Sequence, residues 1–408
     1  MAKCCIEQLK QCSKYDLHLL MRIIAIALGV YTVTFLIVLP WICNEWAYSK
    51  YFQDSNTREK QLRNKVDKIN TERLSKAKEY FNQSDPEESI KFYKLLEMNS
   101  HIDIAVGVVT VKRTHPKLEL GYLTQVMQAI DSIFKTHSKN LNNVLFICNT
   151  DDSPKDYHEA KYLSEFVPMH ILPHYKQGPS DKFSKETSDY AFCLQAGLDY
   201  NPDYVLIIED DTIPYKDIFT VIEHSLARLR SQHYSQSKDW CYLKLFYPQK
   251  WQGYANELMT IIEIIGLAAV GGCATVAVLF VSSKRVTSNL TKCICFVLGA
   301  IYSVLFCVMI GRQYFLELRR LLSPWLYRVI SAPDCCSPAI LYPQHILNQL
   351  IPFLNSTISN KDKPFDYALD DFVRLHNYEQ YLVEPNLLNH IGMYSSLKAQ
   401  SSDPEMFL

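Results

Sequence analysis

Three long apolar runs interrupt an otherwise mixed sequence. The first, Ile23–Ile42, contains no charged residue and has about the length that a helix needs to cross a bilayer. Two shorter runs, Ile264–Val281 and Cys293–Ile310, come late in the chain and are close to the lower limit for a membrane span. The pattern predicts an N-terminal membrane anchor and a later pair of membrane helices. A hydrophobic hairpin buried in a soluble core is the alternative for the later pair.

Basic residues mark one side of these runs. Four precede the first run and three lie between the later two: Lys3, Lys10, Lys14, Arg22, Lys284, Arg285 and Lys292. Because short cytosolic segments carry an excess of lysine and arginine, the N-terminus and the loop between the later runs are expected in the cytosol. Residues Asn44–Glu263 and Gly311–Leu408 then share the non-cytosolic side of the membrane.

Between the membrane runs, strand-like and helix-like patterns alternate. Apolar, β-branched segments predict strands, and segments of helical period lie between the first three of them. In chain order these segments are IDIAVGVVTV, KLELGYLTQVMQAIDSIF, NVLFICNTD, FSKETSDYAFCLQAGLDY and DYVLIIEDD, and WCYLKLFYP follows as a fourth strand. This alternation predicts an α/β fold with a parallel-type sheet covered by helices on both faces. The charged segment Gln53–Phe81, with apolar residues on one helix face, predicts a solvated helical stem.

The same patterns divide the chain into segments. After the second late run, strand-like and helix-like stretches return, so one α/β domain split by a membrane hairpin is expected. The predicted segments are a cytosolic tail (1–21), a transmembrane anchor (22–43), a lumenal stem (44–98), the N-terminal part of the domain (99–256), a transmembrane hairpin with a short cytosolic loop (257–311) and the C-terminal part of the domain (312–408).

Net charge and cysteine content further limit the class of protein to which the chain can belong. The 408 residues carry a formal net charge of −1, which leaves no basic excess for tracking nucleic-acid phosphates. Five of the thirteen cysteines lie in globular-looking sequence: Cys148, Cys193, Cys241, Cys335 and Cys336. In an oxidising compartment some of these five pair. Cys335 and Cys336 are adjacent and make poor partners for each other, so at least one is expected to pair elsewhere.

The strand YVLIIEDD, Tyr204–Asp211, runs from apolar residues directly into three carboxylates, Glu209, Asp210 and Asp211. Like charges this close repel, most strongly at the desolvated end of a strand, so a positive group is expected beside them. One or two such carboxylates suit a hard divalent cation whose shell a substrate diphosphate completes. A solvated acidic turn is the alternative.

Two other predicted strands also end in polar residues. These residues are Thr110, Lys112 and Arg113 after one strand and Asn149, Asp151 and Asp152 after another. In α/β sheets, ligands bind at the carboxyl ends of the strands. The converging strand ends therefore predict a binding site at this edge of the sheet.

Five segments, in this order, carry a family resemblance. They are VGVVTVKR (106–113), KETSDYAFCL (185–194), YVLIIEDD (204–211), KPFDYALDDF (363–372) and EPNLLNHIGMYSSL (384–397). Together they resemble glycosyltransferases of the GT-A, Rossmann-like fold. The post-GPI-attachment N-acetylgalactosaminyltransferase family, known for a catalytic domain split by a tandem transmembrane pair, is the most similar. Several segments are also similar to N-acetylglucosaminyltransferase IV, a more distant relative without the hairpin.

The resemblance implies roles for individual residues. By position, Asp211 would bind Mn²⁺, Glu209 and Asp210 would face uridine and ribose, Val109 and Thr110 would contact uracil, Lys185 and Asp189 would lie on a helix that holds the nucleotide, and His390 would reach the metal or the diphosphate. Imidazole is a reasonable ligand beside a carboxylate. A single histidine taken alone is more often an ordinary core or surface residue.

Asp366 is the expected general base. Sugar transfer with inversion needs a carboxylate that takes the proton of the acceptor hydroxyl while the leaving diphosphate is stabilised. Asp366 follows Pro364 at the start of a helical pattern, where an aspartate also serves as a helix cap. Both interpretations stand at this point.

The implied activity is that of an inverting glycosyltransferase in the Golgi membrane. It would move GalNAc from UDP-GalNAc, with Mn²⁺, to the mannose of glycosylphosphatidylinositol (GPI) anchors on proteins in the Golgi lumen, next to membrane lipid. A GlcNAc transferase acting on N-glycans and a non-catalytic membrane adaptor that keeps the fold are the alternatives. An ion channel is disfavoured because the two late runs carry no lysine, arginine, histidine, aspartate or glutamate within them.

Overall fold

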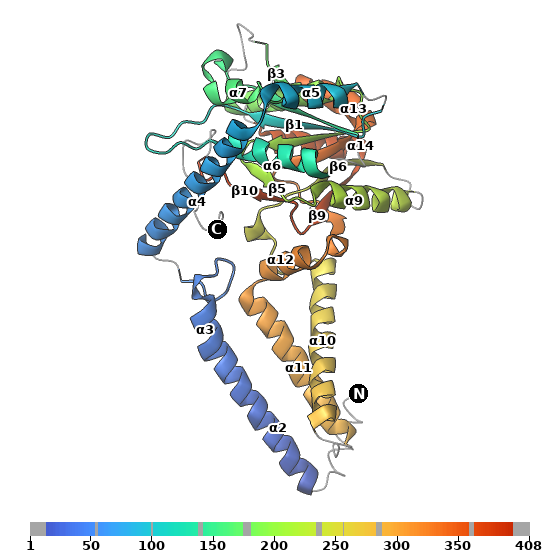
Figure 1. Ribbon diagram of the computed structural model, residues 1–408. Coiled ribbons are helices and arrows are strands. Elements are labelled where there is room, and N and C mark those ends of the chain that lie inside the picture. The colour runs from blue at the N-terminus through green and yellow to red at the C-terminus, as the bar shows by residue number, and fades with distance from the viewer. Residues whose placement is uncertain are drawn as a thin grey trace. The chain divides into compact units, whose positions relative to one another are not determined.

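The computed structural model describes residues 14–53, 56–98, 101–137, 142–173, 181–233, 239–255, 257–282, 288–358 and 363–394 (Figure 1). The chain forms two compact units. One comprises Met1–Ser55 and Gln249–Leu318, and the other comprises Asn56–Pro248 and Arg319–Leu408. Most of the basic residues that predicted the membrane orientation lie outside the described residues: Lys3, Lys10, Lys284 and Arg285.

The second unit is built on a central sheet. Its strands are β1 (Ile104–Thr110), β2 (Asn143–Asn149), β3 (Met169–Ile171), β4 (Tyr204–Glu209), β6 (Trp240–Lys244), β7 (Arg328–Ser331), β8 (Ala339–Pro343) and β9 (Glu379–Glu384). Within the described residues, the strand order is β3-β2-β1-β4-β8-β6-β9-β7. Strands β5 (Thr212–Pro214) and β10 (Leu388–His390) form a small antiparallel pair.

The α/β prediction is confirmed, but the sheet is mixed rather than parallel. Strands β1 to β4 are parallel to one another, in the order β3-β2-β1-β4, with Val106 opposite Leu206. The predicted fourth strand exists as β6, yet β8 lies between β4 and β6 and runs antiparallel to both. Strand β8 follows the membrane hairpin in sequence, so the part of the chain after the hairpin completes the sheet begun before it.

Side chains alternate between the two faces of the sheet, and helices cover both. Val205 and Ile207 of β4 pack into one core, whereas Leu206 and Ile208 pack into the other. Helices α6 (Tyr122–His137) and α9 (Ile218–His233) cover the Leu206 face, and helices α8 (Lys182–Leu198), α13 (Gln344–Thr357) and α14 (Phe365–His376) cover the Val205 face. Helix α7 (His158–Leu163) follows β2. Double-sided cover explains why the central strands read as continuous apolar runs.

The segment interpreted as a stem is helical, but it is not fully solvated. Helices α4 (Asn56–Gln83) and α5 (Pro86–Glu97) belong to the same unit as the sheet. Ala77 and Phe81 of α4 and Tyr93 of α5 are buried. The Tyr93 hydroxyl donates a hydrogen bond to Asp131 of α6 at 2.5 Å. The apolar stripe that predicted a helix therefore packs against the α/β unit.

The first unit contains the apolar helices. Helix α2 (Lys14–Val33), a π-helical turn (Thr34–Val38) and α3 (Leu39–Ile42) continue one another, and α10 (Leu258–Ser282) and α11 (Asn289–Ile310) form the hairpin. Three spans are long and apolar enough to cross a membrane: His18–Glu45, Leu258–Val281 and Asn289–Ile310. Only 6% and 22% of the most apolar windows of the two late spans are buried, which argues against the soluble-core alternative. The protein is thus a membrane protein.

Polar contacts and close backbone approach join the helices of the first unit. A Cβ atom added at Gly271 would lie 2.7 Å from the carbonyl oxygen of Gly299, so α10 and α11 meet where neither residue has a side chain. The Ser303 hydroxyl donates to the Leu267 carbonyl at 2.6 Å. From α2, the Tyr31 hydroxyl donates to the Leu298 carbonyl at 2.6 Å. The N-terminal anchor therefore packs on the hairpin.

Candidate active site

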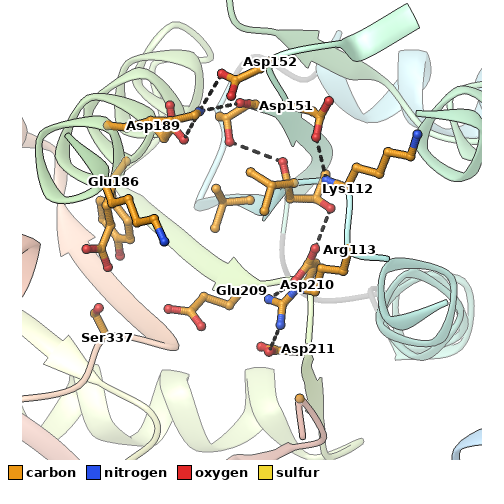
Figure 2. A pocket seen from close by; sticks show the side chains of 18 of the residues that line it. Lys112, Arg113, Asp151, Asp152, Glu186, Asp189, Glu209, Asp210, Asp211 and Ser337 are labelled. Carbon is orange, nitrogen blue, oxygen red and sulfur yellow. Dashed lines mark hydrogen bonds and ion pairs between the residues drawn. The ribbon is translucent and has the colours of Figure 1, made fainter. Parts of the chain in front are cut away.

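A pocket of about 470 Å³ lies at the carboxyl ends of β1, β2 and β4 (Figure 2). The structure brings together at this edge the polar strand ends that the sequence indicated. Its lining includes Val109, Thr110, Lys112, Arg113, Asp151, Asp152, Lys185, Glu186, Asp189, Glu209, Asp210, Asp211, Ser337, His390 and Gly392. Of the residues assigned roles from sequence, all but Asp366 line it.

The three carboxylates lie in the tight connection from β4 to β5. Glu209 ends β4, and its N–H donates to the Pro338 carbonyl at 2.8 Å. The N–H of Asp210 donates to the Val109 carbonyl at 3.1 Å, which keeps the turn against the end of β1. The side chains of Asp210 and Asp211 are almost fully buried.

The positive group expected beside the carboxylates is a side chain of the protein, Arg113. One guanidinium nitrogen lies 2.6 Å from Asp210 Oδ1 and the other lies 2.6 Å from Asp211 Oδ2. Burial alone would lower the pKa of Arg113, but the two carboxylates more than reverse this and raise it. Arg113 therefore stays charged and balances two of the three acidic groups.

Thr110 fixes the second oxygen of Asp210. The Thr110 hydroxyl donates to Asp210 Oδ2 at 2.6 Å and lies 2.8 Å from the Tyr157 hydroxyl. Because the Thr110 proton is used toward Asp210, Tyr157 donates to Thr110. Burial raises the pKa of Tyr157 well above its ordinary value, so this hydroxyl keeps its proton. Both oxygens of Asp210 are thus held by protein donors.

Asp211, Glu209 and His390 form a candidate metal centre. Each offers one ligand atom, and these three atoms lie within 4.8 Å of one another. His390 Nε2 is 3.5 Å from Asp211 Oδ2. Two carboxylates and an imidazole are a donor set that a divalent cation accepts, so the residues present fit a metal.

The pKa directions at this centre follow from burial and charge. Burial would raise the pKa of Asp211, but Arg113 and His390 lower it. Burial raises the pKa of Glu209 to about 8, and the Asp211 charge adds to this rise. For His390, burial would lower the pKa, yet the Asp211 carboxylate raises it. The cluster thus concentrates negative charge on Asp211, the residue expected to hold the metal.

Gly392 has no side chain, and the Asp211 carboxylate occupies the space that a side chain there would fill. A Cβ atom at position 392 would lie 1.8 Å from Asp211 Oδ2. No real contact is that short, so any larger residue would displace the carboxylate. Gly392 had no assigned role in the sequence, although it follows His390 in the segment NHIG.

Changing Gly392 to alanine is expected to lower the transfer rate by about 100-fold, since a displacement of about 1 Å in a reacting site has an effect of that size. Gly253→Ala is the matched control, because the nearest atom to a Cβ there is Gln313 Nε2 at 3.8 Å. Steady-state kinetics of both variants checks this. Equal activity of the two variants would show that the Asp211 position does not matter.

Helix α8 carries further pocket residues. The Asp181 side chain accepts from the Ser184 N–H and begins the helix. One turn on, Lys185 Nζ lies 2.8 Å from Asp189 Oδ2 and donates to the Thr150 carbonyl at 2.9 Å. A disulfide between Cys148 of β2 and Cys193 of α8 ties the helix to the sheet. Lys185 and Asp189 are therefore fixed in the pocket wall.

A comparison with known protein families identifies the family of this chain. A sequence model of the GPI-N-acetylgalactosamine transferase PGAP4 family matches residues 104–389, from the start of β1 into β10. The chain belongs to this family. The family resemblance seen in the sequence is confirmed.

A solved structure also shows similarity. The chain is similar to one described as a WbbM bifunctional glycosyltransferase in its apo form, at 12% sequence identity and a TM-score of 0.31. The match covers 69% of this chain and 38% of the other. The chain therefore spans well under half the length of that bifunctional protein.

In this GPI-GalNAc transferase family member, Glu186 is a pocket residue without an assigned role in the sequence. It follows Lys185 on α8 and lines the pocket. Burial raises the pKa of Glu186 to about 7, and the Asp366 carboxylate adds to the rise. Sequence alone gave no signal, because one helical carboxylate resembles any solvated one.

The raised pKa predicts a pH-dependent effect of Glu186→Gln. The pKa in the folded state lies above the ordinary 4.5, so the free energy of unfolding falls as pH rises from about 4.5 to 7. A glutamine side chain does not ionise, so the Glu186→Gln variant does not lose this free energy of unfolding as the pH rises. The variant is expected to exceed the parent by about 1–2 kcal/mol at pH 8, after discount for solvent screening, and to match it at pH 5. Thermal unfolding at both pH values in a chelator checks this, and equal shifts at both would contradict it.

Asp366 lies in the first turn of α14 but does not cap it. The N-cap position is Pro364, with no side-chain hydrogen bond. Asp366 Oδ2 instead accepts from the Cys336 N–H at 3.0 Å. Asp366 Oδ1 is buried and, among the described residues, has no hydrogen-bond partner. Asp366 therefore does not cap α14, and its role as a general base stays a proposal.

A buried lysine holds the loop before β8. Lys244 of β6 is 0% exposed, and its Nζ donates to the Pro333 carbonyl at 3.0 Å and the Cys335 carbonyl at 2.8 Å. Burial lowers the pKa of Lys244 to about 8, while Asp366 acts in the opposite direction. Together with Asp366, Lys244 fixes the loop that brings Ser337 to the pocket.

Cys335 and Cys336 form a disulfide with each other, so the expectation that at least one pairs elsewhere is wrong. The backbone of Cys336 is left-handed, with φ of 74°. Cys241 of β6 is buried and free.

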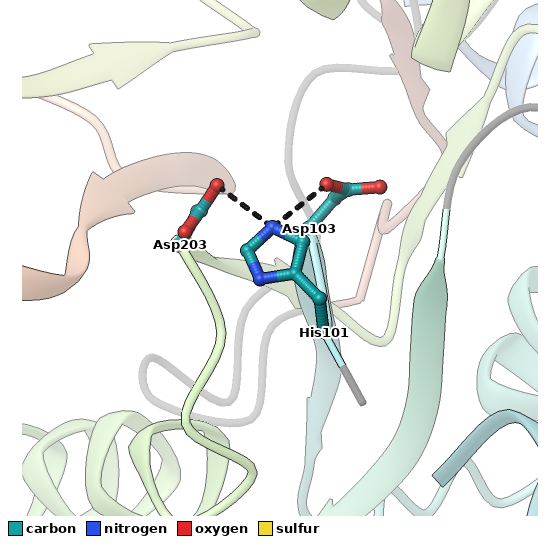
Figure 3. A group of neighbouring side chains, drawn as sticks. All are labelled: His101, Asp103 and Asp203. Atoms are coloured by element: carbon teal, nitrogen blue, oxygen red, sulfur yellow. Dashed lines mark ion pairs between the residues drawn. The ribbon is translucent and has the colours of Figure 1, made fainter. Parts of the chain in front are cut away.

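A second cluster of metal-binding residue types lies at the opposite edge of the sheet (Figure 3). His101 Nε2 is 3.3 Å from both Asp103 and Asp203, which precede β1 and β4. The His101 side chain is 57% exposed. Exposed ion pairs of this kind contribute little to stability. This cluster is separate from the pocket.

Proposed function

We propose that the protein is an inverting glycosyltransferase that moves GalNAc from UDP-GalNAc to the mannose of GPI anchors on proteins in the Golgi lumen. The observation that carries the proposal is the convergence of Arg113, Asp211 and His390 in one pocket at the carboxyl ends of β1 and β4. Family membership gives the transferase class and the GPI-linked acceptor.

The charges in the pocket suit a nucleotide diphosphate. Arg113 and Lys185 supply cationic groups for the phosphates. Glu209 and Asp210 supply acceptors for ribose hydroxyls and for the uracil N–H. Val109 and Thr110 end β1 beside them and form the proposed uracil-contacting wall.

A divalent cation completes the proposed donor site. Asp211 and His390, with Glu209 beside them, would hold Mn²⁺. When bound, the ion would stabilise the negative charge that develops on the departing diphosphate. Arg113 keeps Asp210 and Asp211 aligned through its two short contacts.

Asp366 is the proposed general base for the acceptor hydroxyl. Its Oδ1 is buried and, among the described residues, accepts no hydrogen bond, while its Oδ2 accepts from the N–H of Cys336, the residue before Ser337 of the pocket lining. Glu186 is a second candidate because it lines the pocket and its pKa is raised to about 7. A base with a pKa near the working pH transfers protons most effectively.

The proposed location of the protein in the Golgi membrane is consistent with a lipid-anchored acceptor. Three candidate spans make a membrane protein, and the Cys148–Cys193 disulfide suits an oxidising compartment such as the Golgi lumen. A GPI acceptor is itself anchored in lipid, so its glycan stays close to the bilayer surface. Golgi membrane lipid is accordingly a proposed partner.

The acceptor is tested with the full chain in lipid nanodiscs, given Mn²⁺ and an equal mixture of UDP-GalNAc and UDP-GlcNAc. A GPI-anchored protein and a glycoprotein carrying only N-glycans serve as competing acceptors, and mass spectrometry locates the added sugar. GalNAc on the GPI mannose is the expected result. Sugar on the N-glycan would support the GlcNAc-transferase alternative, and no transfer with intact folding would favour the adaptor.

A further inference from the structure

Helix α12 (Arg312–Leu322) and the 3₁₀ turn Pro324–Leu326 expose a set of large apolar side chains. The set consists of Leu318, Leu321, Leu322, Trp325 and Leu326 and is called here the α12 apolar face. Leu321 is 71% exposed and Trp325 is 69% exposed. Positions 318, 321 and 322 follow helical spacing of three and four residues, so they lie on one side of α12, and Trp325 and Leu326 follow in the 3₁₀ turn. Clustered exposed apolar side chains of this kind mark an interaction surface.

The polar side of the same helix faces the protein. Arg312 is buried, forms a 3.1 Å ion pair with Glu263 and donates to the Gln252 carbonyl at 3.0 Å. Gln313 donates to the Gln249 carbonyl at 3.0 Å. Leu316 is also buried, but three of the four leucines of α12 point outward, whereas a surface helix in water keeps its apolar stripe inward. The α12 helix is therefore oriented for a medium that accepts apolar groups.

The contacts of the last turn continue this arrangement. The Arg320 guanidinium lies 4.0 Å from the centre of the Tyr215 ring, so a basic group also packs inward. The Trp325 ring stacks on His224 at 3.9 Å, and this contact fixes the ring while leaving most of it exposed. A fixed tryptophan with one face outward is typical of the boundary between water and lipid.

Chain connectivity limits where the α12 apolar face can lie. Only Gly311 separates the end of the membrane helix α11, at Ile310, from the start of α12. A helix rises about 1.5 Å per residue, so Leu321 and Leu322 lie within roughly 20 Å of the point where α11 leaves the apolar span. The face is thus continuous in sequence with a helix that is long and apolar enough to cross a membrane.

We propose that the α12 apolar face binds the lipid surface of the membrane, as an interfacial amphipathic segment on the side where the chain continues into β7. Leucine and tryptophan side chains at this depth enter the boundary between headgroups and acyl chains. The segment then acts as a lateral contact that complements the three spans.

Photo-crosslinking of the full chain in phosphatidylcholine–phosphatidylserine vesicles tests this contact. Benzoyl-phenylalanine replaces Leu321, or Leu375 of α14 as a control that is equally exposed, at 70%. After irradiation, a lipid adduct on the peptide with position 321, at least ten times more abundant than at 375, is expected. Equal labelling at both positions, no lipid adduct at 321, or an adduct to a second protein chain there would overturn the proposal.

A second arm rests on the proposed function. Leu321→Glu with Leu322→Glu places charge in the face, and Leu375→Glu is the control. The double variant is expected to hydrolyse UDP-GalNAc as the parent does and to lose about tenfold in transfer to a GPI acceptor embedded in vesicles. An unchanged transfer rate, with hydrolysis intact, would contradict a role for lipid contact in reaching the acceptor. The crosslinking experiment does not depend on catalysis. It therefore still tests lipid contact at position 321 if the proposed function is wrong.

Discussion

Replacement of Asp211 by asparagine is expected to lower the rate of sugar transfer by about 1,000-fold, the range seen when a group that stabilises charge in the transition state is lost. Asp211 contacts both Arg113, at 2.6 Å, and His390, at 3.5 Å. Asparagine keeps the shape but removes the charge, and its NH₂ group cannot bind a cation or accept from Arg113. Its remaining carbonyl oxygen is an uncharged acceptor, so both metal binding and the alignment of Arg113 are weakened together.

Asp203→Asn is the matched control for this change. Asp203 is an exposed carboxylate at the opposite edge of the same sheet and pairs only with His101 among the contacts that the structure describes. Its variant is expected to keep the parent rate. Transfer kinetics and thermal unfolding are measured on the same preparations. A folded Asp211→Asn protein with a loss smaller than tenfold would show that Asp211 does not hold the reacting group.

Replacement of Arg113 by methionine has the second largest expected effect, because it acts on stability and on activity. It leaves Asp210 and Asp211 buried side by side without their shared cation. Removing one partner of a buried ion pair costs about 3–5 kcal/mol, and Thr110 still satisfies one oxygen of Asp210, so a loss of about 3 kcal/mol is expected. Transfer is expected to fall about 100-fold or more, since the diphosphate loses a cationic contact.

Lysine at position 113 separates charge from geometry. An ammonium group reaches one carboxylate but not both at 2.6 Å, whereas the guanidinium forks between them. Arg113→Lys is therefore expected to fall between the parent and Arg113→Met in both stability and rate. Arg230→Met, which removes a surface arginine near the opposite sheet edge, is the control. A methionine variant as stable as the parent would mean that the carboxylates are not mutually repelling.

The α/β fold could be predicted because each central strand is buried on both faces. Strand β4 needs apolar residues at every position, and its run from Val205 to Ile208 shows this directly. The mixed order could not be predicted. Strand β8 lies between β4 and β6 through pairings such as Ile208 with Ala339, and such long-range pairing leaves no local periodicity.

The candidate site was predictable where parallel strands bring their carboxyl ends together. Thr110 and Glu209 end neighbouring strands and were expected on one edge for that reason. The pairing of Arg113 with Asp210 and Asp211 was not predictable, because it depends on how the loop after β1 folds back. Gly392 was missed for a similar reason, since its contact with Asp211 joins residues far apart in sequence.

The membrane helices were predictable from sequence for a different physical reason. A bilayer demands a continuous apolar length, and Ile23–Ile42 meets that demand without reference to the rest of the fold. The Cys335–Cys336 disulfide shows the opposite case. It joins adjacent residues, of which Cys336 has a left-handed backbone, and a general rule on adjacent cysteines does not anticipate it.

Turnover of nucleotide sugars by the purified full chain tests the central claim most directly. UDP-GalNAc and UDP-GlcNAc are compared in the presence of Mn²⁺ and in the presence of a chelator, with release of UDP as the measured quantity. The account predicts turnover of UDP-GalNAc that requires Mn²⁺ and exceeds turnover of UDP-GlcNAc at least tenfold. Preference for UDP-GlcNAc, or failure to bind either nucleotide sugar, would contradict it.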